Sequence, residues 1–428
     1  MERPFDAIVV GAGPAGSACA YNLAKEGLEV LLVERGKFAG AKNMWGGAFY
    51  GPGLSELLPD FYEEAPYERY VSSQRISVLS ENSSLSVEFK TEKFSQRPYN
   101  GIILLRSKFD RWLAGRAERA GAILASGLQV DGLIWNGNCV AGIKAGGDEI
   151  RSHVVVACDG VNSSLAKEAG LRAKLEPREV KQSVKEVFQF SPTEIEERFN
   201  LTGNEGLAWE FFGSFTRGMP GGAFIYTNKD SLSIGVVIQL SALVEKKQMI
   251  SEVLDSFKKH KAVARLLEGG KPVEYSAHLI PVRPLGKTRL YSNGIIVTGD
   301  AASFILATGL LLEGANFALA SGVAAAKAVL RAKERNDFSA ESLSFYEKFL
   351  TDGFVLKDLK TFQQVASILE NVRLYQAYPQ LACDFAERLL TNDGKPRKHA
   401  WRFFTESMRE KVSAYDLIRD VLKGGRRL

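Results

Sequence analysis

The stretch DAIVVGAGPAGSACAYNLAKEGLEVLLVER, residues 6–35, carries the strongest structural signal in this chain of 428 residues. The run FDAIVV at 5–10 is apolar and rich in β-branched residues, as in a buried parallel strand. Gly11, Gly13 and Gly16 follow as G-x-G-x-x-G. Because this pattern stands between a strand and a helix, it predicts a βαβ unit that binds a dinucleotide.

Each residue of this motif has a physical task. Gly11 permits a tight turn, Gly13 lets the backbone approach a pyrophosphate, and Gly16 allows close packing of helix on strand. Pro14 stands where a helix begins, a position that tolerates its missing N–H. Glu34 ends the next strand, where its carboxylate would accept hydrogen bonds from ribose hydroxyls. The predicted cofactor-binding residues here are Gly11, Ala12, Gly13, Pro14, Ala15, Gly16, Glu34 and Arg35.

Two later strands favour FAD over the alternative, NAD. VVVACDG at 154–160 and GIIVTGDAA at 294–302 are buried-strand patterns that end in an acidic residue beside glycine. A carboxylate at such a strand end would lie near ribityl hydroxyls, and the two alanines would open a helix that approaches closely. No second glycine motif of this quality follows for a separate nicotinamide domain. The predicted FAD contacts here are Asp159, Gly160, Gly299 and Asp300.

The composition excludes several classes of protein. With 45% hydrophobic and 25% charged residues and a net charge of +5, the chain is a globular protein without the basic stripe of nucleic-acid binders. Its four cysteines and four histidines lack the spacing of zinc or iron–sulfur ligands, so we expect no metal site and a reducing compartment. We see no signal peptide and no uncharged apolar run of 18 residues, which predicts a cytoplasmic chain without a membrane span.

The C-terminal end is basic. Residues 385–428 hold eleven Lys or Arg against six Asp or Glu. One interpretation is a solvated helical tail, and the other is a face for an acidic partner or an anionic membrane.

Further motifs carry a resemblance to a family. The nucleotide motif, Asp159-Gly160 and Gly-Asp-Ala-Ala are shared with the wide group of flavoproteins related to glutathione reductase and p-hydroxybenzoate hydroxylase. Four other stretches resemble the electron transfer flavoprotein–quinone oxidoreductases, in their bacterial FixC/EtfC-like branch. These are GAKNMWGGAFY at 40–50, GGAFIYTNKDSLSIGVV at 221–237, EYSAHLIP at 274–281, and LENVRLYQAYPQLACDF with TNDGKPRKH near the C-terminus.

The resemblance implies an α/β fold: a Rossmann-type FAD-binding domain, an inserted, mostly antiparallel β-sheet substrate domain, and a helical C-terminal region. We expect the discontinuous FAD-binding domain at 1–75, 98–170 and 287–342, the substrate or quinone domain at 76–97 and 171–286, and the partner-binding helices at 343–428.

Several further cofactor contacts follow. Lys42, Asn43, Gly46 and Gly47 would form the loop beside the isoalloxazine ring, with an ordinary loop as the alternative. Arg106, at a strand–helix junction, would contact phosphates or the ribityl chain, with a surface arginine as the alternative. Val130 would pack near adenine. A helix start within Gly309 to Asn316 would point its dipole at the flavin pyrimidine, although the role of Glu313 there stays open.

The implied activity is electron transfer through FAD, and no catalytic side chain is identified. Electrons would arrive from an electron transfer flavoprotein of α and β subunits and leave to a membrane quinone. Eukaryotic members carry a four-cysteine iron–sulfur module that this chain lacks, which implies a separate ferredoxin-like subunit. The chain would lie at the inner face of the cell membrane, and FFGSFTRGMPGG at 211–222 is either a quinone face or a turn-rich loop.

Two other functions remain open. One is an NAD(P)H- or ferredoxin-linked flavin enzyme, such as an isoprenoid (geranylgeranyl) reductase or an aromatic monooxygenase. The other is a non-catalytic flavin wiring subunit of an electron-bifurcating complex.

Overall fold

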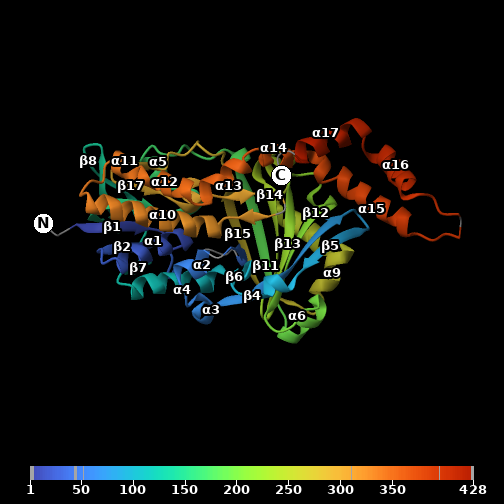
Figure 1. Ribbon diagram of the computed structural model, residues 1–428, viewed down its shortest axis with the longest axis horizontal. Coiled ribbons are helices and arrows are strands. Elements are labelled where there is room, and N and C mark those ends of the chain that lie inside the picture. The colour runs from blue at the N-terminus through green and yellow to red at the C-terminus, as the bar shows by residue number, and fades with distance from the viewer. Residues whose placement is uncertain (1–3, 43–45, 52, 310, 395, 426–428) are drawn as a thin grey trace.

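The computed structural model describes residues 4–42, 46–51, 53–309, 311–394 and 396–425. Its strands form two large sheets. The first lies at the end of the molecule that holds the N-terminus, the second lies in the middle, and the last helices lie at the opposite end (Figure 1).

The first sheet has the strand order β16-β17-β10-β1-β2-β7, and β8 and β9 form a hairpin on β10. Strands β1, β2, β7, β10 and β17 run parallel. The apolar runs of β1, β2 and β17 and the end of β10 are buried, as in strands covered on both faces. The bounds are β1 Phe5–Val10, β2 Val30–Glu34, β7 Ile123–Ser126, β8 Val130–Asn136, β9 Cys139–Ala145, β10 Asp148–Ala157, β16 Tyr291–Ser292 and β17 Ile295–Val297.

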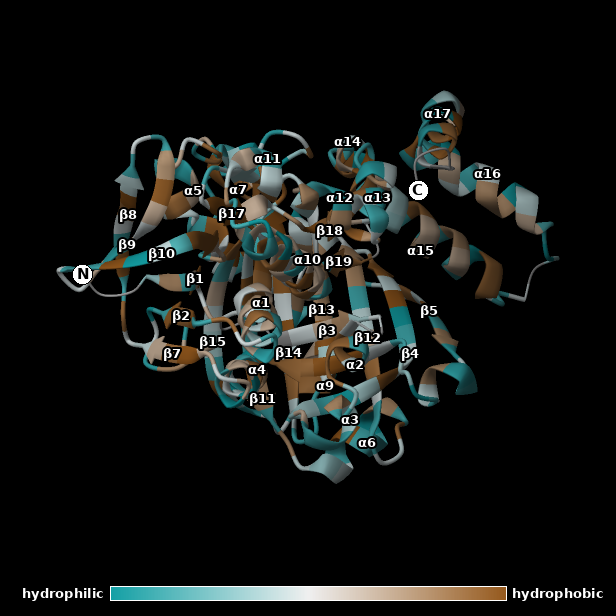
Figure 2. Ribbon diagram, turned by 60° about the vertical axis from the view of Figure 1, so that its left-hand side comes forward, coloured by the Kyte–Doolittle hydropathy of each residue, from teal (hydrophilic) through white to brown (hydrophobic). Residues whose placement is uncertain are grey.

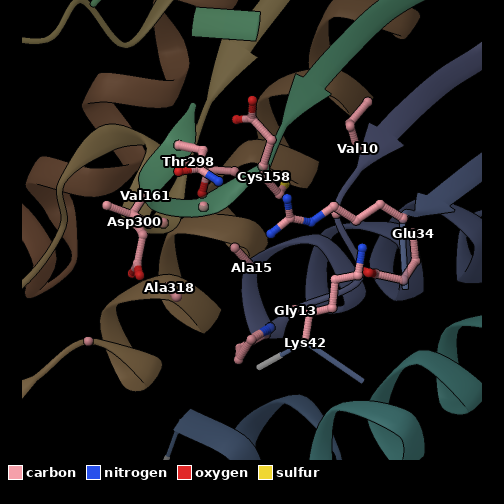
Figure 3. A pocket seen from close by; sticks show the side chains of 18 of the residues that line it. Val10, Gly13, Ala15, Glu34, Lys42, Cys158, Val161, Thr298, Asp300 and Ala318 are labelled. Carbon is pink, nitrogen blue, oxygen red and sulfur yellow. The ribbon is translucent and has the colours of Figure 1, made fainter. Parts of the chain in front are cut away.

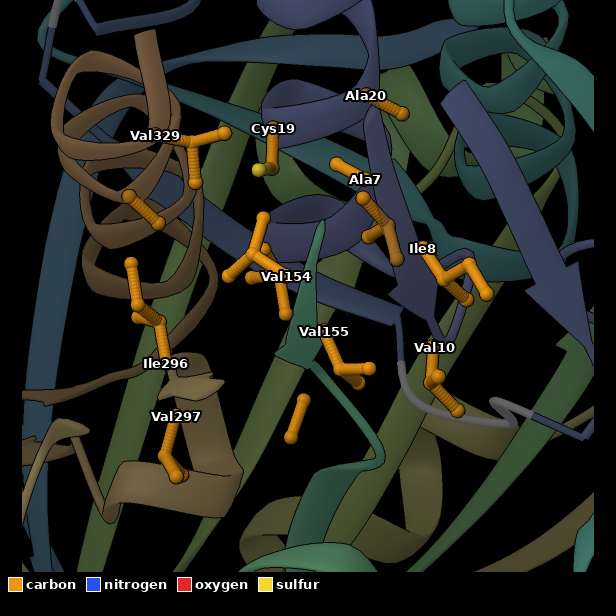
Figure 4. Close-up of a cluster of buried hydrophobic side chains, with 14 of the residues drawn as sticks. Ala7, Ile8, Val10, Cys19, Ala20, Val154, Val155, Ile296, Val297 and Val329 are labelled. Carbon is orange, nitrogen blue, oxygen red and sulfur yellow. The ribbon is translucent and has the colours of Figure 1, made fainter. Parts of the chain in front are cut away.

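Helices α1 (Pro14–Lys25), α4 (Arg106–Arg119) and α10 (Ala315–Glu334) pack together beside this sheet. Figure 4 shows strand residues such as Val154 and Ile296 beside Cys19 of α1 and Val329 of α10. Helices α1 and α10 can approach closely because Gly322 of α10 has no side chain. A Cβ there would lie only 2.0 Å from the backbone oxygen of Ala15. This contact fixes α10 against the start of α1, where the glycine motif lies.

The second sheet has the order β15-β11-β14-β13-β12-β4-β6-β3, with β5 on β4. All its pairs are antiparallel except β12 with β4, which confirms a mostly antiparallel sheet. The bounds are β3 Gly46–Tyr50, β4 Tyr67–Leu79, β5 Ser84–Lys90, β6 Gly101–Leu105, β11 Val180–Gln189, β12 Glu205–Gly213, β13 Gly221–Thr227, β14 Ser231–Gln239 and β15 Lys271–Pro281.

Helices cover one face of this second sheet. Inward residues of β11, β12 and β14 form an apolar core with α6, α8 and α9, and Figure 2 shows hydrophobic colour along these strands. The helices beside the sheets are α2 Gly53–Leu57, α3 Phe61–Glu64, α5 Ser164–Glu168, α6 Pro192–Phe199, α7 Leu240–Lys246, α8 Ile250–Lys259 and α9 Lys261–Leu267. The opposite face, which carries the alternate residues of each strand, is turned away from these helices.

The C-terminal region is helical, as expected. Its elements are α11 Ala340–Leu343, α12 Phe345–Asp352, α13 Val355–Thr361, α14 Val365–Leu369, α15 Ala377–Leu390, α16 Ala400–Lys411 and α17 Ala414–Gly425. Helices α11, α12 and α13 contact α10 beside the first sheet, whereas α15 contacts β4, β5 and β12 of the second sheet. Within the described residues, every helix falls short of the length and apolar character that a membrane crossing requires.

The structure differs from expectation after the Gly-Asp strand. Gly299–Ala302 forms a single 3-10 turn rather than the start of a helix. The turn ends because Ser303 adopts a left-handed conformation with φ of 61°. A short hairpin of β18 (Leu306–Ala307) and β19 (Leu312–Glu313) follows, and the helix begins only at Ala315.

The sheets also bear on the proposed domain division. Strand β4 crosses the predicted boundary between residues 75 and 76, and β3 and β6 pair in the second sheet although their residues were assigned to the FAD-binding domain. The division into domains therefore stays a proposal.

Candidate functional site: a pocket at the strand ends

A cavity of about 400 Å³ opens at the carboxyl ends of β1, β2 and β10. Ligands of open α/β sheets bind at such strand ends. Figure 3 shows Glu34 and Asp300 on opposite sides of this cavity. The predicted residues that line it are Gly11, Gly13, Pro14, Ala15, Glu34, Arg35, Lys42, Arg106, Val130, Asp159, Gly160, Gly299 and Asp300.

Other predicted contacts lie elsewhere. Ala12 and Gly16 are absent from the described lining, as is Gly47 of β3. Gly309 lines a second, smaller cavity instead. The Asn316 side chain donates a hydrogen bond to Glu313 at 2.6 Å, and Asn43 lies outside the described residues.

The glycine turn leaves no room for side chains. Gly11 has φ of +105°, and a Cβ there would lie 2.3 Å from the backbone oxygen of Cys158. A Cβ at Gly16 would lie 1.9 Å from the oxygen of Gly11. The start of α1 is thus held against β1 and β10, so its free N–H groups and positive dipole end face the cavity, as a pyrophosphate requires.

Glu34 is fixed at the end of β2. Its Oε2 accepts a hydrogen bond from the Ala12 N–H at 3.1 Å, and its Oε1 accepts one from the Gly36 N–H at 2.6 Å. The carboxylate therefore ties the glycine turn to β2 and stands at the cavity wall, where a ribose would lie.

Arg106 is held by its neighbour one helical turn away. Its Nε and Nη2 donate to the two carboxylate oxygens of Asp110 at 2.6 and 2.7 Å. Burial lowers the pKa of Arg106, but the charge and hydrogen bonds of Asp110 outweigh it and raise the pKa overall. The guanidinium is a charged, oriented group in the cavity wall rather than a mobile surface side chain.

Asp159 offers a free acceptor. Its Oδ2 accepts from the Leu165 N–H at 3.0 Å and from the Ser164 hydroxyl at 3.2 Å. Its Oδ1 is buried without a hydrogen-bond partner among the described residues, and burial raises the pKa of this carboxyl. Since buried polar atoms are nearly always paired, the orphan oxygen fits a ligand hydroxyl, as FAD would supply.

Sequence reasoning missed two groups of lining residues. One surrounds Val130 at the nucleotide end, and the other comes from the second sheet and the hairpin before α10. On β15, strand alternation puts His278 and Ile280 on one face. Both lie in the stretch EYSAHLIP at 274–281, which carries the family resemblance but was not predicted as a cofactor contact. The missed residues are Val10, Val33, Leu128, Gln129, Cys158, Val161, Asn162, Ser164, Leu165, His278, Ile280, Thr298, Ile305, Leu312, Gly314, Ala315 and Ala318.

A second cavity of about 80 Å³ adjoins the first, and Leu312 lines both. Its walls come from the face of the second sheet that is turned away from α6, α8 and α9, and from the segment before α10. Within it, the Tyr226 hydroxyl donates a hydrogen bond to Oε1 of Glu210 at 2.8 Å. Its lining residues also include Lys181, Phe212, Gly221, Gly222, Phe224, Gly309, Leu311, Leu369 and Tyr375.

The parallel sheet, the glycine turn and the elongated cavity define an FAD-dependent oxidoreductase. The family model described as FAD dependent oxidoreductase matches residues 6–93. A geranylgeranyl bacteriochlorophyll reductase-like structure from Thermoplasma acidophilum has a TM-score of 0.75 at 21% identity, over 99% of both chains. The myxobacterial halogenase CndH has a TM-score of 0.65 at 18% identity, over 100% of this chain and 91% of its own. These two likenesses concern the fold alone.

The chain belongs to the electron transfer flavoprotein–quinone oxidoreductase/FixC family. The ETF-QO/FixC family C-terminal domain matches residues 365–428. The chain is 41% identical to the probable electron transfer flavoprotein-quinone oxidoreductase YdiS of Escherichia coli (strain K12), over 99% of both chains. It is 38% identical to FixC of Bradyrhizobium diazoefficiens, over 93% of this chain and 92% of that protein. The family resemblance, the fold class and FAD as the cofactor are thereby confirmed.

Proposed function

We propose that this FAD-linked electron transfer oxidoreductase accepts electrons from an electron transfer flavoprotein, through a separate ferredoxin-like subunit, and passes them to a membrane quinone. The observation that carries the proposal is the second cavity, which adjoins the FAD cavity at Leu312. Bound FAD would supply the redox chemistry, and the chain would hold it and admit the acceptor.

The predicted contacts are proposed as the FAD site in that scheme. The glycine turn and the start of α1 would hold the pyrophosphate, and Glu34 the adenosine ribose. Arg106 and Asp159 would face the polar middle of the cofactor. Lys42, Asn43, Gly46 and Gly47 would form the loop beside the ring.

The second cavity suits a quinone head. Phe212, Phe224 and Leu369 give it apolar walls, while Glu210 and Tyr226 place a carboxyl and a hydroxyl within it. A flat ring with two carbonyl oxygens needs this mixture of apolar walls and a few polar groups.

Electrons would enter on the side of the C-terminal helices. Helix α17 exposes Tyr415, Ile418, Val421 and Leu422 by 56–72%, at helical spacing on a basic segment. Ferredoxin-like subunits with an acidic surface would be attracted to such a face. The same apolar and basic character would serve peripheral contact with the inner face of the cell membrane.

A reconstituted assay tests the proposal. The purified yellow chain, its electron transfer flavoprotein and its ferredoxin-like subunit should together reduce a soluble quinone under anaerobic conditions. Omission of the ferredoxin-like subunit should abolish the flux. Oxidation of NAD(P)H by the lone chain, stimulated by an organic substrate, would instead support a reductase or monooxygenase.

A further inference from the structure

Glu210 occupies an unusual position in the middle of strand β12. Its neighbours Trp209 and Phe211 point to the opposite face, into the apolar core under α8, where Phe211 contacts Phe257 with ring centroids 4.9 Å apart. Strand alternation therefore turns Glu210 to the face away from α8, where it lines the second cavity. Glu210 therefore puts a carboxyl among aromatic side chains, at a position where an apolar residue would ordinarily pack.

The groups around Glu210 do not neutralise a carboxylate. Its hydrogen-bond partner is the neutral hydroxyl of Tyr226, which is 7% exposed. Among the described residues, Glu210 makes no ion pair. Tyr50 of β3 has a buried hydroxyl without a partner in the described chain, and the nearby acidic charge is Glu313 on β19.

One cation faces the same cavity. Lys181 of β11 lines it with Glu210, but burial lowers the pKa of this amine to about 8. Burial likewise raises the pKa of Glu210 to about 8, although the hydrogen bond from Tyr226 acts in the opposite direction. Burial and then the charge of Glu210 raise the pKa of Tyr226 and Tyr50, so neither hydroxyl competes to lose a proton near neutral pH. The raised pKa favours the protonated form of Glu210 at neutral pH, so its carboxyl can serve as a proton donor in this cavity.

We propose that Glu210 is the proton donor to the electron acceptor in the second cavity, and that Tyr226 positions its carboxyl. The inference rests on the proposed function, because the acceptor there is a quinone. Reduction of a quinone to a quinol takes two electrons and two protons. Bound FAD in its reduced form would supply the two electrons and one of the protons. The Glu210 O–H bond breaks to give the second proton to a quinone oxygen, and the carboxylate that remains is reprotonated from solvent.

The test compares an acceptor that needs a proton with one that does not. The FAD-loaded chain is photoreduced without oxygen and mixed with a soluble quinone or with ferricyanide, which takes electrons alone. Glu210→Gln keeps an acceptor for the Tyr226 hydroxyl but cannot give up a proton. It should slow reoxidation by the quinone about 10²-fold or more and leave reoxidation by ferricyanide unchanged. The native rate with quinone should fall above about pH 8, and the variant should lose that dependence.

Two further variants separate proton donation from structure. Glu186→Gln, on the opposite face of the same sheet where Glu186 pairs with Lys258 at 2.9 Å, should change neither reaction. Tyr226→Phe should slow the quinone reaction less than Glu210→Gln, because it misorients the acid without removing it. Equal slowing with both acceptors in Glu210→Gln, or an unchanged quinone rate, would overturn the proposal.

An infrared measurement makes failure of the two proposals distinguishable. The infrared difference spectrum of the FAD-loaded chain between about pH 6 and about pH 10 should show the carbonyl stretch of a protonated carboxyl, and Glu210→Gln should lack it. If the native chain does not reduce quinone, the proposed function fails, and this band decides whether Glu210 is still a protonated acid that could serve another acceptor. Absence of the band in the native chain would refute the role of Glu210 whatever the acceptor is.

Discussion

The two ends of the cofactor pocket are built in opposite ways. At the pyrophosphate end, consecutive residues 11–16 place backbone atoms, and a Cβ added at Gly11 or Gly16 would collide with backbone oxygens. At the other end, side chains converge from separate strands: His278 of β15 in the pocket itself, and Glu210 of β12 with Tyr226 of β13 in the adjoining second cavity. Backbone contacts hold the common part of a nucleotide, whereas converging side chains can adapt to the reaction. Substitutions at the first end should therefore affect binding, and those at the second end should affect proton chemistry.

The largest effect should come from a substitution in the glycine turn at the pyrophosphate end. Gly11→Ala adds a Cβ 2.3 Å from the Cys158 oxygen at a left-handed φ, so we expect colourless protein without bound FAD. Strain of about 1–3 kcal/mol should also appear in denaturant unfolding. Gly27→Ala is the matched control at the other end of α1, because Gly27 also has positive φ but nothing within 4 Å of its Cβ position. A yellow Gly11→Ala protein would contradict the account of this turn.

The second effect is a change in the free energy of unfolding with pH, which arises from Glu210 in the second cavity. The pKa of Glu210 is about 8 in the folded chain against 4.5 as the ordinary value. Between these values the unfolded chain releases a proton that the folded chain keeps, so stability falls as pH rises, by up to about 1.4 kcal/mol per pH unit. Below pH 4.5 both states are protonated, and above about pH 8 the loss is complete.

Denaturant unfolding of the FAD-loaded chain across this range measures that loss. Glu210→Gln should show a shallower fall than the native chain, and Glu186→Gln should show the native slope. Parallel curves for the native chain and Glu210→Gln would mean that Glu210 is ionised in the folded protein.

A smaller effect should follow a side-chain change at the pyrophosphate end. Glu34→Ala removes the acceptor for the N–H groups of Ala12 and Gly36 and the proposed ribose contact. A hydrogen bond to a charged group contributes about 1.5–3 kcal/mol, so FAD should bind about 10- to 100-fold more weakly. Titration of the apo chain with FAD measures this loss. Affinity equal to that of the native chain would place the ribose away from Glu34.

The smallest effect should lie in the C-terminal helices. Asp420 of α17 accepts hydrogen bonds from Arg373, Asn371 and Tyr378, and these groups outweigh burial and lower the pKa of its carboxyl. Asp420→Asn should loosen α17 by about 1 kcal/mol. Hydrogen exchange should rise in 414–425 while FAD binding stays native. A change in FAD affinity would show that this region is coupled to the pocket.

The βαβ unit at the pyrophosphate end could be predicted because the residues that determine it are close together in the sequence. A strand, a glycine turn, a helix and a second strand stand in order within residues 5–35, and the structure forms them there. The pairing of Arg106 with Asp110 was also within reach, since residues four apart meet on a helix surface. The prediction of a helix directly after Gly299 was wrong because Ser303 adopts a left-handed conformation, which no residue type in this stretch indicates.

The other end could not be read from the sequence in the same way. Glu210 and Tyr226 are 16 residues apart and meet only through the pairing of β12 with β13. His278 reaches the pocket because β15 lies at the edge of the second sheet. Which residue faces the cavity depends on strand register, and a shift by one residue would turn each side chain to the other face.

A crystal structure of the yellow chain with a soluble quinone analogue tests the central claim most directly. The account predicts the FAD pyrophosphate at Gly11–Ala15, the ring near Leu312 and His278, and a quinone oxygen within hydrogen-bond distance of the Glu210 carboxyl. A ring that lies at Glu34, or a quinone bound away from the second cavity, would contradict it.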